Sequence, residues 1–97
     1  MQNITVKDNG NNVSTYSVYD YTVEYSVTIM CFNNNYMVYG AVHHEDYSVY
    51  VENDSMFKNV SDALETLKSC AFARLNDYNA NKMCALLSTV IRMFDEC

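Results

Sequence analysis

The sequence predicts an α+β domain in which an antiparallel meander of about four strands precedes two C-terminal helices packed on one of its faces. Tyrosine and valine alternate with polar residues before residue 57, whereas alanine, leucine and methionine recur at helical spacing after it. A chain of 97 residues with 49% hydrophobic content is long enough for one core and too short for two. We therefore expect a single domain over 1–97, with a sheet part at 1–57 and a helical part at 58–97.

The strongest strand pattern runs from Tyr19 to Cys31, where apolar residues occupy the odd positions and mostly polar residues the even ones, so the odd positions should be buried. Similar but shorter patterns predict strands from Ile4 to Lys7, Tyr36 to His43 and Tyr47 to Glu52. Asparagine-rich segments separate them, and asparagine tolerates the left-handed backbone angles that tight turns need. The sequence thus predicts hairpin connections made without proline.

Hairpin closure also predicts which side chains share a face. Closing the last hairpin over His44 and Glu45, or over four residues from His43 to Asp46, places Val42 opposite Tyr47. A two- or four-residue turn around Asn34 and Asn35 gives the middle strand the same parity, and a three-residue turn would reverse it. The outward face is then expected to carry Asp20, Thr22, Glu24, Ser26, Thr28, Met37, Tyr39, Ala41, His43, Ser48, Tyr50 and Glu52.

From Val60 the apolar residues follow a helical period. Asn59 or Ser61 can cap the first helix, which should end near Asn76, and a second helix should begin around Asn79 to Asn81. The expected core positions of the helices are Leu64, Leu67, Ala71, Leu75, Met83, Leu86, Leu87, Val90, Ile91 and Phe94.

The charges are distributed unequally along the chain. Residues 1–57 contain seven carboxylates and Lys7 as their one lysine or arginine, whereas residues 58–97 contain five acidic and five basic residues. The net charge of −6 is the wrong sign for a protein that binds nucleic acid through its phosphates. Because the helices should cover one face of the sheet, the carboxylates are expected on the other face and on the turn at Glu45 and Asp46, close to a cross-strand pair of tyrosines.

The sequence offers little support for catalysis or for a bound cofactor or metal. His43 and His44 are adjacent on a predicted strand, so their side chains should point to opposite faces. Cys31 is expected to face the core while His43 faces outward, which argues against a nucleophilic pair. No cysteine pair has metal-site spacing, and we expect reduced thiols, with Cys97 exposed. We expect a non-enzymatic, cytoplasmic protein without membrane segments, and keep a small metal-dependent or hydrolytic enzyme as the least favoured class.

These observations favour a binding surface for a basic, nucleic-acid-binding protein, whose lysines and arginines would meet unneutralised carboxylates. Two alternatives remain: a solvated face whose charges prevent aggregation, or a homodimer interface formed by the tyrosine-bearing sheet. The residues expected to contact the partner are Asp20, Glu24, Tyr39, Glu45, Asp46, Tyr50 and Glu52.

In its size, its acidic residues from Asp20 to Asp54 and its sheet-plus-helices layout, the chain resembles small acidic proteins encoded by bacteriophages and mobile elements, among them anti-CRISPR inhibitors. Many such inhibitors fill the nucleic-acid groove of a Cas effector with an acidic surface. The resemblance implies an inhibitor that acts as a DNA mimic in the cytoplasm of a host cell.

Overall fold

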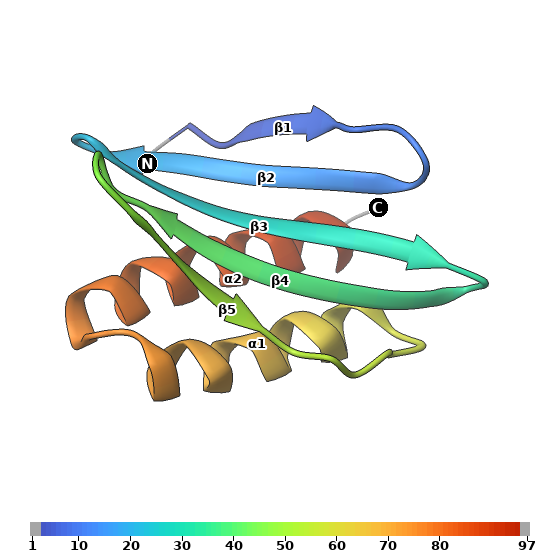
Figure 1. Cartoon of the computed structure of the whole chain (residues 1–97). Helices are drawn as coiled ribbons and strands as arrows, with labels where there is room; N and C mark the ends of the chain where they lie inside the picture. The colour runs from blue at the N-terminus through green and yellow to red at the C-terminus, as the bar shows by residue number, and fades with distance from the viewer. Residues whose placement is uncertain (1–2, 96–97) are drawn as a thin grey trace.

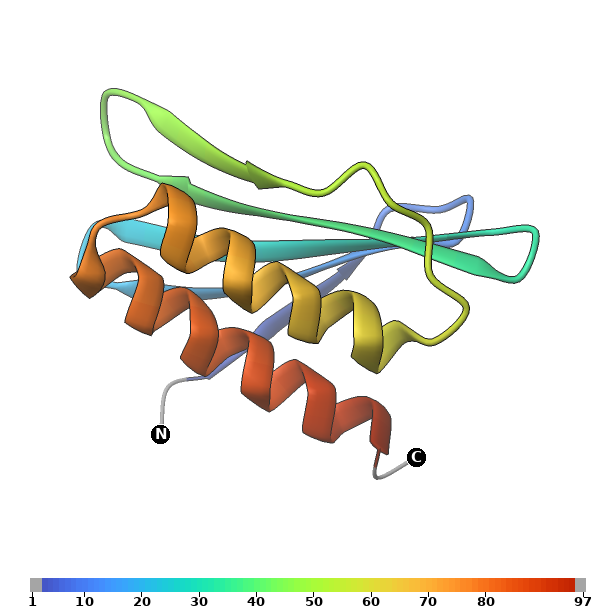
Figure 2. The ribbon, with the colours of Figure 1, turned by 90° about the horizontal axis from the view of Figure 1, so that it is seen from below.

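Five antiparallel strands and two helices make up residues 3–95, the part of the chain that the structure, a computed structural model, describes. In chain order they are β1 (Thr5–Asp8), β2 (Val13–Asp20), β3 (Val23–Phe32), β4 (Asn35–His43), β5 (Ser48–Glu52), α1 (Val60–Arg74) and α2 (Asp77–Asp95). Each strand pairs with the next one in sequence, so the sheet order is β1-β2-β3-β4-β5 (Figure 1). Both helices lie on the same face of the sheet (Figure 2). The fold is α+β, as the sequence predicted.

Within residues 3–95 the meander has one strand more than predicted, because Val13–Asp20 forms β2 and the predicted strand from Tyr19 to Cys31 runs across the turn between β2 and β3. β2 ends at Asp20, and a two-residue hairpin leads into β3. Tyr21 adopts a φ of 58° there, in a region that asparagine and glycine favour. A tyrosine at this position therefore did not indicate a turn in the sequence. A two-residue turn places even positions of β2 on the same face as odd positions of β3. Tyr19 and Tyr21, predicted to be buried, are therefore 61% and 95% exposed.

Asparagine supplies the backbone conformation of the β3–β4 hairpin, as expected from the sequence. Asn33 and Asn34 have φ values of 52° and 64°, and a type I′ turn requires positive φ at both central positions. This two-residue turn gives β4 the predicted parity, since Val38 and Val42 are buried beneath the sheet. The middle strand therefore presents its odd positions to the side without helices.

The β4–β5 hairpin differs from its predicted register by two residues. It closes over a four-residue loop in which the His44 amide donates to the Tyr47 carbonyl over 2.8 Å. Val42 consequently pairs with Val49 rather than with Tyr47. A shift of two residues leaves every side chain on its predicted face, because the strand period is two. Tyr47, predicted to lie opposite Val42 in the sheet, instead lies in the loop and is 60% exposed.

Asparagine side chains also begin both helices. The Asn59 side-chain oxygen accepts hydrogen bonds from the amides of Ser61 and Asp62, at 2.8 and 3.4 Å. The Asn76 side-chain oxygen accepts one from the Asn79 amide at 2.8 Å. α2 begins at Asp77, earlier than predicted, because the asparagine expected to end the first helix instead caps the second.

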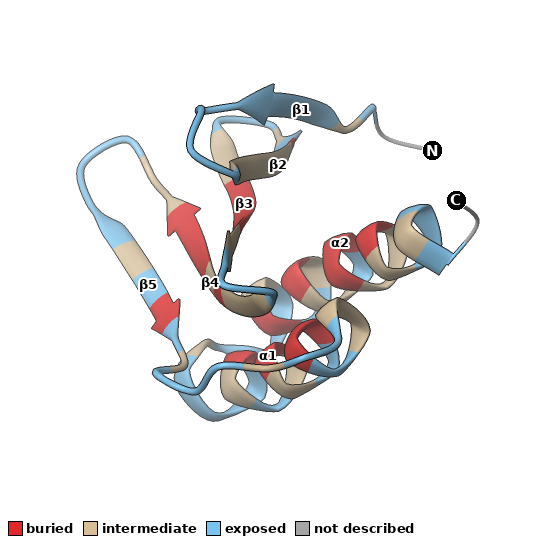
Figure 3. Ribbon diagram, turned by 90° about the vertical axis from the view of Figure 1, so that its right-hand side faces the viewer, coloured by how far each residue is buried: buried red, intermediate tan, exposed pale blue. Residues whose placement is uncertain are grey.

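The core lies between the helices and β2 to β5. α1 packs on β4 and β5, and α2 packs on β2, β3 and β4. Buried residues gather on β3, β4 and the inner sides of both helices (Figure 3). Gly40 permits the close approach of α2, since a Cβ atom there would lie 3.2 Å from the Met83 sulfur. Among the described elements, β1 contacts β2 alone.

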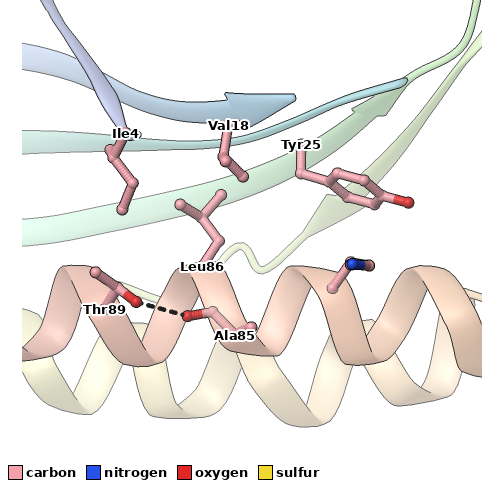
Figure 4. Close-up of a pocket in the computed structure, with 7 residues that line it drawn as sticks. Ile4, Val18, Tyr25, Ala85, Leu86 and Thr89 are labelled. Carbon is pink, nitrogen blue, oxygen red and sulfur yellow. Dashed lines mark hydrogen bonds between the residues drawn. The ribbon is translucent and has the colours of Figure 1, made fainter. Parts of the chain in front are cut away.

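An apolar cleft of about 200 Å³ lies between α2 and the strands β2 and β3 (Figure 4). Leu86 of α2 points toward Val18 of β2 there, with Ile4 and Tyr25 on either side (Figure 4). The remaining lining residues of the cleft are Lys82, Ala85 and Thr89.

Candidate functional site

The side of the sheet opposite the helices forms the candidate site. The strand register places outward side chains of four strands next to one another, and we call this set the open face. By strand, the open face comprises Thr15, Ser17 and Tyr19 of β2; Glu24, Ser26 and Thr28 of β3; Met37, Tyr39, Ala41 and His43 of β4; and Ser48, Tyr50 and Glu52 of β5.

The centre of the open face is a hollow of about 390 Å³ with a floor of small side chains. Ser26 and Thr28 are each 5% exposed and Ala41 is 1% exposed, although no helix covers them. The hydroxyl oxygens of Thr28 and Thr15 lie 3.1 Å apart and share a hydrogen bond. Larger neighbours on the same face therefore shield a polar floor.

Aromatic side chains form one wall of this hollow. The Tyr39 and Tyr50 rings have centroids 6.5 Å apart and are tilted by 54°, and the His43 ring meets Tyr50 edge-on at 6.0 Å. His43 is held in place by a 2.7 Å hydrogen bond between its Nδ1 and the Ser48 hydroxyl. Tyr50 is nevertheless 49% exposed, so the wall presents a large aromatic surface to solvent.

A second hollow, of about 430 Å³, lies on the other side of the same tyrosines. Glu52 pairs with Tyr39 across β4 and β5, and Asp54 follows in the chain just after β5. Both acidic residues line this hollow, together with Met37, Val38, Tyr39, Tyr50 and Asn53. The arrangement places carboxylates beside aromatic rings, as the sequence predicted for this part of the sheet.

The carboxylates on this side of the molecule remain free of cationic partners. Among residues 3–95, no lysine or arginine lies within ion-pair distance of Glu24, Glu52 or Asp54. Glu45 and Asp46 are exposed in the β4–β5 loop and are likewise without such a partner in the described chain. Lys7 lines the β1 edge of the central hollow, so one cation borders the open face.

Asp20 is the exception, and its predicted place on the outward face is wrong. It lies at the end of β2 on the helix side, where its carboxylate accepts a hydrogen bond from the Tyr78 hydroxyl and lies 3.7 Å from the Lys82 ammonium. Its side chain is 11% exposed. The hydrogen bond to Asp20 and, to a smaller extent, burial raise the pKa of Tyr78 to about 12. Asp20 thus anchors α2 to the sheet and is not available to a partner on the open face.

The structure therefore brings together six of the seven side chains that the sequence singled out. Glu24, Tyr39, Tyr50 and Glu52 share the open face, and Glu45 and Asp46 extend it along the β4–β5 loop. The sequence reasoning did not single out Asp54 or the hydroxyl floor. Asp54 could have been found from its spacing, because it lies two residues after Glu52 and successive side chains of an extended chain alternate.

The described chain shows no cluster typical of a metal site. Residues 3–95 contain no group of three or more His, Cys, Asp or Glu side chains placed to hold a metal ion. Cys31, Cys70 and Cys84 are free thiols that are half-buried rather than fully buried, and burial raises the pKa of Cys84. Cys97, expected to be exposed, lies outside the described residues.

No helix within residues 3–95 is both long and apolar enough to cross a membrane. Comparison with protein-family models, with curated proteins and with solved structures finds no match to this chain.

Proposed function

We propose that this protein is a non-enzymatic binding protein whose open face and β4–β5 loop dock onto a basic, nucleic-acid-binding protein. The observation that supports the proposal is a set of carboxylates without cationic partners beside exposed tyrosines. Such a surface attracts a basic partner over a distance and then offers rigid aromatic contact area. Lysines and arginines that normally hold phosphates would meet Glu24 and Glu52 instead.

The specific form of the proposal is an inhibitor that blocks the nucleic-acid groove of a host protein such as a CRISPR–Cas effector, in the host cytoplasm. A hollowed face with a polar floor suits a protruding basic element of the partner better than a flat face would. Asp20 has no part in this surface, because Tyr78 and Lys82 occupy it.

The test is competition for a purified basic nucleic-acid-binding protein, a Cas effector first, that carries fluorescently labelled DNA. The protein should displace the DNA, and association should slow as ionic strength rises. Glu52→Lys should slow association further and weaken its salt dependence.

Glu65→Lys is the matched control, because it makes the same change of charge at an exposed glutamate on α1. It should leave association close to that of the unmodified protein. Equal effects of the two reversals would show that net charge, and not the open face, governs binding, and would refute the assignment.

Self-association through the open face is the alternative function. A two-fold interface brings the same patch of both copies together, so Glu24 and Glu52 of one copy would meet the carboxylates of the other. This repulsion disfavours a dimer at low salt. Sedimentation at low and high ionic strength separates the two proposals. A protein that is monomeric at both ionic strengths supports docking to a basic partner, whereas a dimer supports self-association.

A further inference from the structure

We propose that the hollow beside Tyr39 and Tyr50 binds an arginine side chain of the partner, an inference that rests on the proposed docking function. We call this hollow the tyrosine pocket. It is lined by Met37, Val38, Tyr39, Tyr50, Glu52, Asn53 and Asp54. Its volume of about 430 Å³ falls in the range typical of ligand-binding pockets.

The tyrosine rings offer flat surfaces for a planar cation. Their centroids are 6.5 Å apart and their planes are inclined by 54°, so the two rings do not stack on each other. Tyr50 is half-exposed, and besides Tyr39 its ring meets the ring of His43 edge-on. A guanidinium group can therefore lie against a tyrosine ring, the arrangement that cation–π attraction favours.

The carboxylates supply the second part of the site. Glu52 lies opposite Tyr39 in the β4–β5 register, and Asp54 borders the same pocket. No lysine or arginine within residues 3–95 is in ion-pair distance of either carboxylate. The pocket thus carries two negative charges that a cationic side chain of the partner would neutralise.

Arginine fits this combination better than lysine does. Its guanidinium is planar, stacks on aromatic rings and donates two parallel hydrogen bonds to a carboxylate. The lysine ammonium is compact and strongly hydrated, so it gains less from a ring that stays open to solvent. The apolar side chain of Met37 at the pocket suits the methylene stem of arginine.

The experiment uses three short peptides with identical sequences except for one central residue: arginine, lysine or the uncharged citrulline. Their affinities for the full chain are measured by NMR titration at low ionic strength, with the tyrosine ring signals as the readout. The arginine peptide should bind at least about fivefold more tightly than the lysine peptide, because it adds stacking to charge.

Tyr50→Leu and Glu52→Gln should each abolish this preference, whereas Glu65→Gln on α1 should preserve it. Since Tyr50 and Glu52 are both exposed, the variants should retain the fold, which circular dichroism checks directly. The citrulline peptide should bind the unmodified protein and Glu52→Gln equally weakly, because it lacks the charge that the carboxylate contacts.

Each other outcome overturns the inference. An arginine preference that persists in Tyr50→Leu and Glu52→Gln places the arginine elsewhere. Equal binding of the arginine and lysine peptides, reduced by Glu24→Gln, leaves the open face as a docking surface without an arginine pocket. Binding of neither cationic peptide overturns both this inference and the proposed function.

Discussion

The two faces of the sheet exclude water by different means. On the helix side, apolar residues such as Val27 and Val42 are fully buried because α1 and α2 cover them. On the open face, Ser26 and Thr28 are almost as well buried, yet only their neighbours in the sheet shield them. The open face is therefore an organised surface with a packed polar floor, and its carboxylates are available because no helix covers them.

The helix side should dominate stability, which core truncation tests most strongly. Leu67 of α1 is fully buried. Leu67→Ala should lower the free energy of unfolding by about 2–5 kcal/mol, because it removes apolar contacts and leaves a cavity. Urea denaturation followed by circular dichroism measures the change. Phe72→Ala, on the exposed side of the same helix, is the control and should cost far less.

Two acidic residues on either side of the β2–β3 turn differ in the same way as the two faces do. Asp20 binds Tyr78 and Lys82 on the helix side, whereas Glu24 lies on the open face without a cationic partner in the described chain. Asp20→Asn should reduce the free energy of unfolding by about 1–2 kcal/mol, because it removes the charge that strengthens the Tyr78 hydrogen bond and attracts Lys82. Glu24→Gln should stay within about 0.5 kcal/mol of the unmodified protein.

The same denaturation experiments measure both variants. Equal losses would contradict the placement of the two carboxylates on opposite faces. The proposed function adds a second contrast, because Glu24→Gln should weaken binding to the basic partner while Asp20→Asn should not.

The hydroxyl pair of Thr15 and Thr28 on the open face should contribute less to the free energy of unfolding than the Asp20 contacts do. The Thr28 hydroxyl shares a hydrogen bond with Thr15, which also accepts one from the Asn9 side chain. Thr28→Val keeps the approximate shape and loses this bond, so we expect a loss of about 0.5–1.5 kcal/mol in unfolding free energy. Thr22→Val, at the exposed turn, is the matched control, and a similar loss there would contradict the prediction.

The pH dependence at the Asp20 anchor is the smallest expected effect. Because the pKa of Tyr78 is raised to about 12 from an ordinary value of 10.0, the folded protein holds this proton more tightly than the unfolded chain does. The contribution to stability is therefore complete below pH 10.0 and is lost as pH rises through about 12. Chemical denaturation across this range should show a shallower decline for Tyr78→Phe than for the unmodified protein. Parallel declines would contradict the prediction.

The sequence predicted the fold class, the helical cores and most of the open face, because period-two and period-3.6 patterns depend on burial alone. It failed at the β2–β3 turn. Tyr21 adopts a backbone conformation that tyrosine rarely takes, so neither the extra strand nor the reversal of Asp20 could be read from residue types. The predicted β4–β5 register was wrong by two residues. Hairpin loops that differ in length by two residues leave each side chain on the same face of the sheet, so the alternation of apolar and polar residues could not distinguish them.

The tyrosine pocket could be predicted only in part. Glu52, Tyr39 and Tyr50 followed from strand parity, which both hairpins fixed independently. The hollow itself depends on how the tyrosine rings tilt and on the path of the chain after β5, and tertiary packing determines both.

The sheet order also bears on how quickly the molecule folds. Every strand pairs with its neighbour in sequence, so each hairpin closes over a short loop, and the contacts of greatest sequence separation arise where α2 docks on β2 and β3. Low contact order favours rapid folding, and we expect this chain to fold faster than a Greek-key sandwich of equal length. Stopped-flow refolding would measure the rate, and a main folding phase of seconds or longer would contradict this expectation.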